Sequence, residues 1–438
     1  MADRDYLYFR VSQGDDAFPL QAGPRTLTLW LDTDNDRATG RQLGHPAKSV
    51  WMGVELEIHF SPTTEEGVQR GVALTAYDYA GREWPISHAD VDLLALPTYA
   101  ADWHEGRISR YIETEYGPLV GLTDRGTARG MFVGLDEKDE VEYYTDPFVI
   151  NKPAASDAAP LADVDLPAKV PGAIRIVSYN VLRGSPMADP EPFARVFAAI
   201  DADIALIQEW DGGDAATLES WFTALVPTQT GWSALAGHGG VAIVAQHEIA
   251  PLGPATLSTG ERNVRFVGAN VLTPHGSVGV ISVHLKCCGT KGSEEDHERI
   301  AETELINAMF FDAFANDGLT TRIIGGDLNL VGSRTPLEIL RQRLAKDETD
   351  MDIAETRVLG DGTAYTWRDA QSAFPNGRLD YVVTTGGQVV QAFTLDTARL
   401  SNAALARLGL DRTDTDLSDH LPVVIDLIPT HNATARTE

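Results

Sequence analysis

A set of polar side chains interrupts apolar runs in the second half of the sequence, each near the end of a run that reads as a strand. They are Asn180, Glu209, His284, Asp327, Asn329, Asp380, Asp419 and His420. A strand end is rigid and the loop beyond it opens to solvent, so a side chain there can be both fixed and accessible. Amide and carboxylate oxygens suit Mg²⁺, Mn²⁺ or Ca²⁺, and neighbouring histidines can donate hydrogen bonds to an anionic oxygen. The set therefore predicts metal-assisted chemistry at a phosphoryl group.

The segments that must position these side chains are short apolar strands that alternate with amphipathic helices. The expected strands are 173–180, 203–209, 240–246, 265–272, 277–285, 321–329, 379–385 and 421–428, and the expected helices are 190–200, 215–225 and 294–315. Strands with helical layers outside them predict an α/β sandwich for residues 172–430.

The first half of the chain has a different pattern. The expected strands are 6–12, 26–32, 54–60, 71–79 and 108–115, and several of them alternate apolar and polar residues. With no long helical period between them, they predict a β-sandwich over residues 1–150. The segment 151–171 is rich in Ala, Pro and Asp and lacks periodicity, so we expect an exposed linker there.

The polar residues of the second half belong to motifs that occur in a known order. The motifs are SYNVL (178–182), IQEW (207–210), GGVAIV (239–244), SVHLK (282–286), GGDLNL (325–330), RLDYVV (378–383) and SDHLPV (418–423). Over residues 172–428 this set resembles that of the endonuclease/exonuclease/phosphatase (DNase I-like) superfamily. The resemblance implies a four-layered α/β sandwich with two stacked mixed sheets. It also implies a single in-line hydrolytic step without a covalent intermediate.

The resemblance implies a metal site that holds Mg²⁺ or Mn²⁺. Glu209 resembles the principal metal ligand, and Asn180 beside it lines the metal and phosphate site. Asp419 resembles an additional ligand of the same site.

The resemblance also implies catalytic roles. Asp327 matches the carboxylate that orients or deprotonates the attacking water, and Asn329 matches the amide that holds the scissile phosphate. His284 matches a histidine that contacts the phosphate. His420 matches the histidine that stabilises developing charge, with Asp380 as the carboxylate that orients it.

Basic residues near the motifs could hold a substrate phosphate. Lys286 and Arg265 are the candidates, together with Lys291 and Arg262. The alternative is that these are ordinary solvated surface charges.

A second, independent metal site is predicted in the segment LWLDTDNDRATG (29–40). Asp32, Asp34 and Asp36 alternate there, which places three carboxylates on a tight loop, as oxygen-ligand Ca²⁺ sites need. The segment departs from an EF-hand because Arg37 stands at the turn-glycine position. The alternative is an Asp-rich turn without an ion. The pattern of this domain is similar to carbohydrate-binding-type β-sandwiches of secreted bacterial proteins, as a fold-level analogy.

Composition narrows the function classes. The chain has 438 residues, with 35 Lys and Arg against 64 Asp and Glu, for a net charge of −29. A surface with this much negative charge repels polyanions. Nucleic acid is therefore disfavoured as a substrate, without being excluded. We therefore expect a metal-dependent phosphodiesterase or phosphatase acting on small-molecule or lipid-headgroup phosphoesters. The alternatives are a DNase-like nuclease and, from another class, a catalytically silent binding protein.

The location of the protein is left open by its sequence. The first residues lack the basic and apolar regions of a secretory signal. This absence predicts a cytoplasmic protein. If the first residue is instead the start of a processed chain, a secreted or periplasmic protein is expected. No apolar run is long enough to span a membrane. Cys287 and Cys288 are adjacent, so we expect free thiols rather than a disulfide framework. The oligomeric state cannot be read from the sequence.

Overall fold

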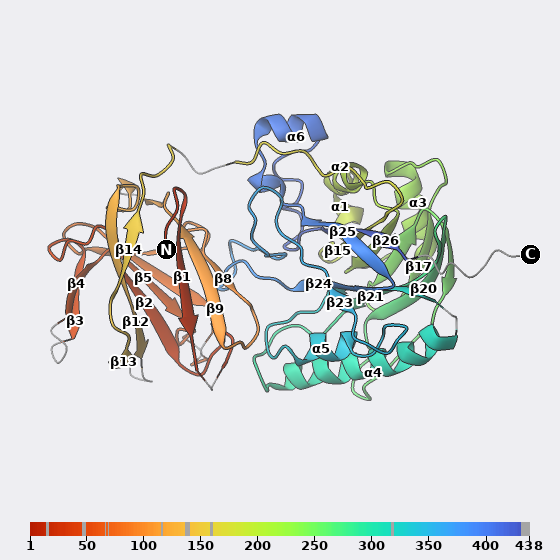
Figure 1. Ribbon diagram of the computed structural model, residues 1–438, viewed down its shortest axis with the longest axis horizontal. Coiled ribbons are helices and arrows are strands. Elements are labelled where there is room, and N and C mark those ends of the chain that lie inside the picture. Colours follow the sequence, from red (N-terminus) through yellow and green to blue (C-terminus); the bar gives the residue numbers. More distant parts are fainter. Residues whose placement is uncertain are drawn as a thin grey trace, which may run out of the picture.

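The computed structural model consists of an all-β region followed by an α/β region, which is the predicted fold class (Figure 1). The structure describes residues 1–14, 17–45, 50–65, 67–68, 70–114, 117–135, 141–157, 161–316 and 319–430. Among the helices of these residues, none combines the length and the apolar character that a membrane crossing requires.

Two packed sheets form the core of the all-β region, which also has two short two-stranded sheets. Its strands are β1 (Tyr6–Ser12), β2 (Thr26–Asp32), β3 (Arg41–His45), β4 (Val50–Val54), β5 (Leu56–Phe60), β6 (Val72–Tyr77), β7 (Glu83–Ile86), β8 (Leu94–Leu96), β9 (Trp103–Ser109), β10 (Glu113–Thr114), β11 (Gly117–Pro118), β12 (Gly126–Leu135), β13 (Val141–Tyr144) and β14 (Phe148–Lys152). A three-stranded sheet, β1-β9-β8, faces a seven-stranded sheet in the order β13-β12-β2-β5-β6-β7, with β14 also paired to β12. The two short sheets are β3-β4 and β10-β11. Side chains such as Phe9 and Leu29 from the two sheets share one core.

The strand expected at 108–115 is the clearest departure from the pattern in this region. Pairing with β1 ends at Ser109. The next residue, Arg110, is fully buried, and its guanidinium donates to the carbonyls of Asp3, Leu122 and Pro153. Because these bonds hold three separate segments, the chain turns at Arg110 instead of continuing the ladder.

Strand β2 is buried along its whole length. Leu27, Leu29 and Leu31 point into the core between the sheets. Trp30 points to the opposite face, where Met52 and others from the β3–β4 hairpin cover it. The period of two therefore places Asp32 on a covered face as well.

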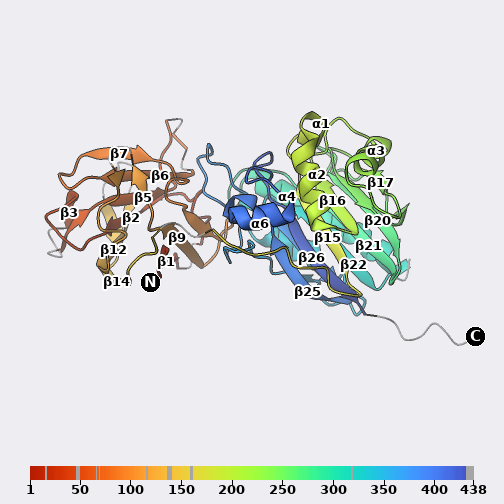
Figure 2. The same cartoon turned by 90° about the horizontal axis from the view of Figure 1, so that it is seen from above.

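The α/β region has four layers (Figures 1 and 2). Its strands are β15 (Ile174–Asn180), β16 (Ile204–Gln208), β17 (Ser233–Ala236), β18 (Ala242–Ala245), β19 (Glu248–Pro251), β20 (Phe266–Thr273), β21 (Gly276–His284), β22 (Thr321–Asp327), β23 (Asp352–Ile353), β24 (Asp380–Thr385), β25 (Gly387–Thr394) and β26 (Val423–Pro429). Its helices are α1 (Ser185–Ala188), α2 (Pro190–Ile200), α3 (Ala215–Leu225), α4 (Glu294–Asn316), α5 (Thr335–Arg341), the 3₁₀ turn η2 (Thr397–Arg399) and α6 (Asn402–Leu408).

The two inner layers are mixed six-stranded sheets. One has the order β17-β18-β16-β15-β26-β25 and the other β19-β20-β21-β22-β24-β23. An aliphatic core fills the space between them. A second core lies between the first sheet and α2, α3 and α6, and a third lies between the second sheet and α4 and α5. The predicted sandwich with helices outside two stacked mixed sheets is confirmed.

Helices α2 and α3 have the bounds that the sequence predicts. Pro190 begins α2, because proline fits the first helical position, where no backbone donor is required. Asp214 caps α3 by accepting a hydrogen bond from the backbone nitrogen of Thr217. Both helices turn their apolar face, including Phe197 and Phe222, into the core over the first sheet.

The two regions make direct polar contacts. Arg107 of β9 forms a two-pronged ion pair with Asp361, with nitrogen to oxygen distances of 2.9 and 2.7 Å, and both side chains are 3% exposed. Arg399 pairs with Asp92 beside it. The hydroxyl of Thr98 contacts the carbonyls of Leu330 (2.7 Å) and Arg378 (3.1 Å). Thus the all-β region is attached to the loops of its neighbour by buried groups.

The connecting segment, described here as 153–157 and 161–171, runs over the α/β region (Figure 2). Ala162 pairs with the backbone of residues 399–401, and Val164 and Leu166 pack against the core below the helices. We expected an exposed linker, but part of this segment is packed, because its scattered apolar residues find partners that composition alone does not reveal.

Candidate active site

Sheet register brings three of the predicted residues side by side. In the second sheet, His284 of β21 is the register partner of Asp327 of β22, and Asp327 is in turn the partner of Asp380 of β24. Partners in adjacent strands point to the same face. The side chains of all three are at most 4% exposed. One row across three strands therefore supplies a histidine flanking two carboxylates.

The first sheet contributes Asn180 and Glu209. Asn180 ends β15, and Glu209 follows β16 in the left-handed region with φ of 60°, a conformation that a non-glycine residue adopts at a cost. The amide nitrogen of Asn180 donates to Glu209 (3.0 Å) and to Asp327 (3.2 Å). Asn180 thus bridges the two sheets, and Glu209, with 21% of its side chain exposed, lies toward the solvent.

His420 is held by a chain of hydrogen bonds. Its Nδ1 lies 2.8 Å from Oδ2 of Asp380, and the hydroxyl of Thr366 donates to the same oxygen at 2.7 Å. The opposite ring nitrogen, Nε2, lies 3.5 Å from Asp327. Burial alone would lower the pKa of His420, but the carboxylates of Asp380 and Asp327 outweigh it and raise that pKa. The raised pKa favours the protonated, cationic form of this ring.

The pKa of His284 is shifted in the opposite direction from that of His420. Burial, with the nearby positive charge of Arg265, holds the pKa of His284 well below its usual value. The guanidinium of Arg265 lies 2.9 Å from Nδ1, and Nε2 lies 3.4 Å from Asp327. Since guanidinium only donates, Nδ1 must accept and Nε2 carries the proton. The ring therefore points an N–H group at the carboxylates.

Asp327 lies between the two histidines. Its Oδ2 also accepts from the amide of Asn329 at 3.1 Å, and Oδ1 accepts from the backbone nitrogen of Asn329 at 2.8 Å. Burial raises the pKa of Asp327, because desolvation outweighs the attraction of His420. A carboxylate with a raised pKa beside a cationic and a neutral imidazole is suited to proton transfer.

Comparison with known proteins agrees with this arrangement. Residues 177–420, more than half of the chain, match the Endonuclease/Exonuclease/phosphatase family. The chain belongs to that family. None of the curated proteins compared with the chain matches it.

Three solved structures illustrate which proteins this chain is similar to. Humanized TDP2 of D. rerio is 13% identical, with 58% of this chain and 99% of that one covered and a TM-score of 0.40. Sphingomyelinase C of Streptomyces griseocarneus is 18% identical, with 58% and 99% covered and a TM-score of 0.38. An AP endonuclease of Archaeoglobus fulgidus is 16% identical, with 57% and 98% covered and a TM-score of 0.39. At these identities and TM-scores, the likenesses do not indicate a substrate.

Endonuclease/exonuclease/phosphatase proteins are typically metal-dependent phosphoester hydrolases, and the residues of this chain fit a divalent metal. Oxygens of Glu209 and Asp327 lie within 4.8 Å of each other, and carboxylate oxygens are the hard ligands that Mg²⁺ prefers. His284 belongs to the same group of side chains, but with Nδ1 accepting from Arg265 its protonated Nε2 donates and does not ligate. Asn180 points its nitrogen at these carboxylates, while its oxygen accepts from the backbone nitrogen of Leu182. In this arrangement Asn180 positions the two carboxylates, and its predicted role as a metal ligand stays a prediction.

Asp419, the third predicted ligand, lies next to His420 but outside this donor group. One of its oxygens accepts from the indole of Trp367 at 2.9 Å. The other oxygen is buried and accepts no hydrogen bond from any described residue. Its neighbour Ser418 donates to the backbone oxygen of Asn180, which ties this loop to the site.

The two predicted phosphate-binding residues have different surroundings. Both terminal nitrogens of Arg265 are engaged, one with His284 and the other with the carbonyl of Leu285. Its position thus indicates support of a catalytic histidine and not direct contact with substrate. Lys286 is half-buried, and its backbone nitrogen donates to Glu302. Within the described residues, its ammonium group forms no ion pair, so it remains available to an anion.

Sequence reasoning missed two residues of the site. Thr366 holds Asp380, and Thr98 reaches from the all-β region to the segments that flank Asn329 and Asp380. Threonine is common in strands and loops, and neither position carries a pattern that distinguishes it. Only the fold brings them to the catalytic loops.

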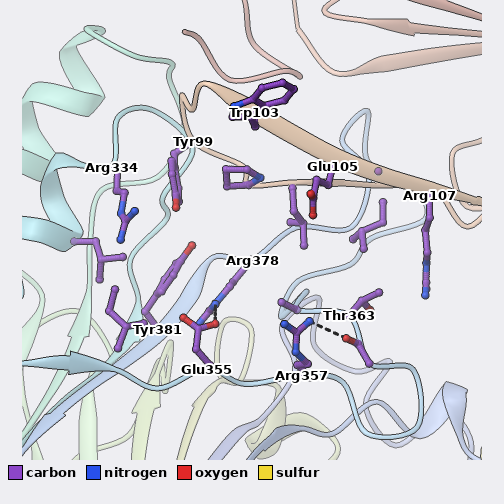
Figure 3. A pocket seen from close by; sticks show the side chains of 18 of the residues that line it. Tyr99, Trp103, Glu105, Arg107, Arg334, Glu355, Arg357, Thr363, Arg378 and Tyr381 are labelled. Carbon is purple, nitrogen blue, oxygen red and sulfur yellow. Dashed lines mark hydrogen bonds and ion pairs between the residues drawn. The ribbon is translucent and has the colours of Figure 1, made fainter. Parts of the chain in front are cut away.

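A cavity of about 530 Å³ between the two regions is separate from this site (Figure 3). Its lining includes Tyr99 and Trp103 on one side and Arg334, Arg378 and Tyr381 on the other. Tyr381 follows Asp380 along β24, so the two side chains point to opposite faces of the sheet. Tyr381 packs in the core under α4 and α5, and the cavity therefore opens away from the catalytic cluster.

Proposed function

We propose that the chain is a phosphodiesterase or phosphatase that hydrolyses small-molecule or lipid-headgroup phosphoesters by in-line attack of water, with Mg²⁺ or Mn²⁺. The observation that carries the proposal is the position of one Asp327 oxygen, 3.4 Å from His284 and 3.5 Å from His420. A base between two imidazole donors is suited to activating water beside an anion whose charge those donors stabilise.

Each residue then has a definite task. Asp327, with its raised pKa, orients the attacking water and accepts its proton. Cationic His420 donates to a non-bridging phosphoryl oxygen, and Asp380 keeps its ring in place. Neutral His284 donates its Nε2 proton from the other side. Asn329, whose amide donates to Asp327, lies beside the base and is assigned to hold the phosphate near the water.

The metal would be held by Glu209 and Asp327. The amide of Asn180 donates to both carboxylates and fixes their positions. When bound, such an ion supplies positive charge against the non-bridging oxygens of the phosphoester. Glu209 is the more exposed of the two carboxylates and therefore the one a substrate-side ion would meet first.

The charge of the whole chain supports a small substrate over a nucleic acid. A net charge of −29 repels a polyanion along its length, whereas a single phosphoester meets mainly the local field of the site. A DNase-like nuclease remains the second candidate, because the hydrolytic residues serve either substrate.

A substrate panel tests the proposal. The purified chain would be assayed with bis-(p-nitrophenyl) phosphate, p-nitrophenyl phosphate, sphingomyelin vesicles and duplex DNA, each with Mg²⁺, with Mn²⁺ and with excess chelator. We expect metal-dependent turnover of the diester or the lipid, and loss of it in Glu209→Gln. Glu191→Gln, an exposed carboxylate at the start of α2, is the matched control.

The panel separates the alternatives. Cleavage of DNA together with inactivity on every small ester would favour the nuclease. Inactivity on all substrates with either metal would favour a silent binding protein. Full turnover in excess chelator would contradict the metal requirement.

A further inference from the structure

Three carboxylates of the all-β region gather outside the catalytic domain. Oxygens of Asp32, Asp34 and Glu55 all lie within 4.8 Å of one another. Asp32 ends β2, Asp34 lies in the loop that follows, and Glu55 lies between β4 and β5. Asp36, the third residue of the predicted set, is not in this group, and its carboxylate accepts from the backbone nitrogen of Ala38.

Two of these carboxylates are buried with oxygens that accept no hydrogen bond within the described part of the chain. Asp32 and Glu55 are 0% exposed. Both oxygens of Asp32 and Oε1 of Glu55 accept no hydrogen bond from any described residue. A buried, ionised carboxylate oxygen that accepts no hydrogen bond has lost its hydration without a replacement interaction. This is strongly unfavourable unless a cation is near.

Basic residues do not neutralise the cluster. Among the described residues, none forms an ion pair with Asp32, Asp34 or Glu55. The nearby ammonium of Lys152 instead donates to the backbone oxygens of Thr33 and Gly121. Accordingly, burial and the repulsion of Asp34 raise the pKa of Asp32 to about 6.

The surrounding loop fixes the cluster in place. The second oxygen of Glu55 accepts from the backbone nitrogen of Thr33 at 2.8 Å. Asp34 accepts from the hydroxyl of Thr39 at 3.1 Å and from the backbone nitrogen of Asp36 at 2.9 Å. These bonds leave both oxygens of Asp32 and Oε1 of Glu55 without a hydrogen-bond donor among the described residues, in a group whose ligand atoms lie within 4.8 Å of one another.

We propose that Asp32, Asp34 and Glu55 bind one calcium ion that ties the 33–40 loop to the start of β5. Calcium suits the site better than magnesium, because full burial of two ligands requires the ion to shed most of its water, and magnesium dehydrates reluctantly. The ion removes the repulsion among three carboxylates and thereby stabilises this edge of the all-β region.

The test uses the full chain at pH 8, stripped of metal with chelator and desalted. Ca²⁺ alone is titrated by calorimetry into the wild type, Asp32→Asn, Glu55→Gln and the control Asp36→Asn. All four are also prepared with Glu209→Gln, which removes the catalytic metal ligand from the measurement. We expect calcium binding to survive Glu209→Gln and Asp36→Asn, and to weaken at least about tenfold in Asp32→Asn and Glu55→Gln.

Melting temperatures give a second test, because the order of the wild type and Asp32→Asn should differ between chelator and Ca²⁺. In chelator, Asp32→Asn should melt at or above the wild-type temperature, because it removes a buried unpaired charge. In Ca²⁺, the wild type should melt higher than Asp32→Asn, because only it gains from binding. Three results would overturn the proposal: unchanged calcium affinity in both variants, a wild-type melting temperature indifferent to Ca²⁺ in the Glu209→Gln background, or Mg²⁺ bound as tightly as Ca²⁺. The last would remove the assignment to calcium.

Discussion

The guanidinium of Arg265 donates a hydrogen bond to Nδ1 of His284 across a distance of 2.9 Å. Arg265 immediately precedes β20 and His284 ends the neighbouring strand β21, where the backbone nitrogen of His284 also donates to the carbonyl of Arg265. The side chain of an arginine thus selects the tautomer of a histidine in the adjacent strand. Without that bond, either ring nitrogen could carry the proton, and only one arrangement directs N–H toward Asp327.

Arg265→Lys should therefore lower kcat by about 10- to 100-fold while KM changes little, because a lysine cannot hold both His284 and the carbonyl of Leu285. Arg343→Lys is the control, since Arg343 is an exposed arginine whose only ion pair among the described residues is with Glu348. Imidazole ¹⁵N shifts would report the tautomer of His284 directly. Unchanged shifts in Arg265→Lys would contradict the role assigned to the bond.

Asp380 and His420 should behave as one unit. His420→Ala should lower kcat by about 10² to 10³, because it removes a donor to charge that develops in the transition state. Asp380→Asn should act through the orientation of His420, so the double variant should be little slower than His420→Ala alone. His297→Ala, an exposed histidine of α4, is the control and should keep wild-type turnover. Losses that multiply in the double variant would show that the two residues act independently.

The strand-end residues could be predicted because their signal is local. Asn180, His284 and Asp327 each stand at the end of a short run of apolar residues. The strand of Asn180 ends where the sequence predicts, and those of His284 and Asp327 end one and two residues before the predicted ends at 285 and 329. A buried strand is recognisable from its composition, and a polar residue at its end is an exception that requires a reason.

The remaining features depend on contacts between distant segments. Arg265 looked like a phosphate ligand because a basic residue near a catalytic motif gives no hint of which side chain it meets. Glu55 was missed because its partner Asp32 lies 23 residues earlier and is reached only through sheet pairing. Helix α5 and strand β25 have weak periodicity and owe their form to packing against their neighbours.

Thr98 should prove to be a positioning residue that lies in the all-β region. Its hydroxyl bonds Leu330, next to Asn329, and Arg378, two residues before Asp380. Thr98→Val keeps the volume and removes the hydroxyl, which should cost about 1–3 kcal/mol in unsatisfied carbonyls and lower kcat several-fold. Thr98→Ser keeps the hydroxyl and should restore kcat. Equal kcat in Thr98→Val and the wild type would show that this contact only joins the two regions.

The pair formed by Arg107 and Asp361 should make the two regions unfold together. Asp361→Asn leaves the buried guanidinium of Arg107 with Asp92 as its remaining charge partner, at 3.2 Å. We expect a loss of about 2–3 kcal/mol in the free energy of unfolding, measured by denaturant titration of the full chain. Asp165→Asn, which removes an exposed pair with Arg407, should cost about 0–1 kcal/mol.

The pH dependence of this loss follows from the carboxyl. Burial opposes its ionisation, but the hydrogen bonds and charge of Arg107 prevail, so the pKa of Asp361 lies below its usual value in the folded chain. Because the pKa of Asp361 is lower in the folded than in the unfolded chain, its carboxylate contributes stability that is fully present above the unfolded pKa of about 3.9. That contribution is lost as the pH falls through the folded pKa. The difference between wild type and Asp361→Asn should therefore be constant from pH 6 to 8 and shrink on acidification below about pH 4. A difference that persists undiminished in acid would show that lost packing, and not the ion pair, accounts for the effect.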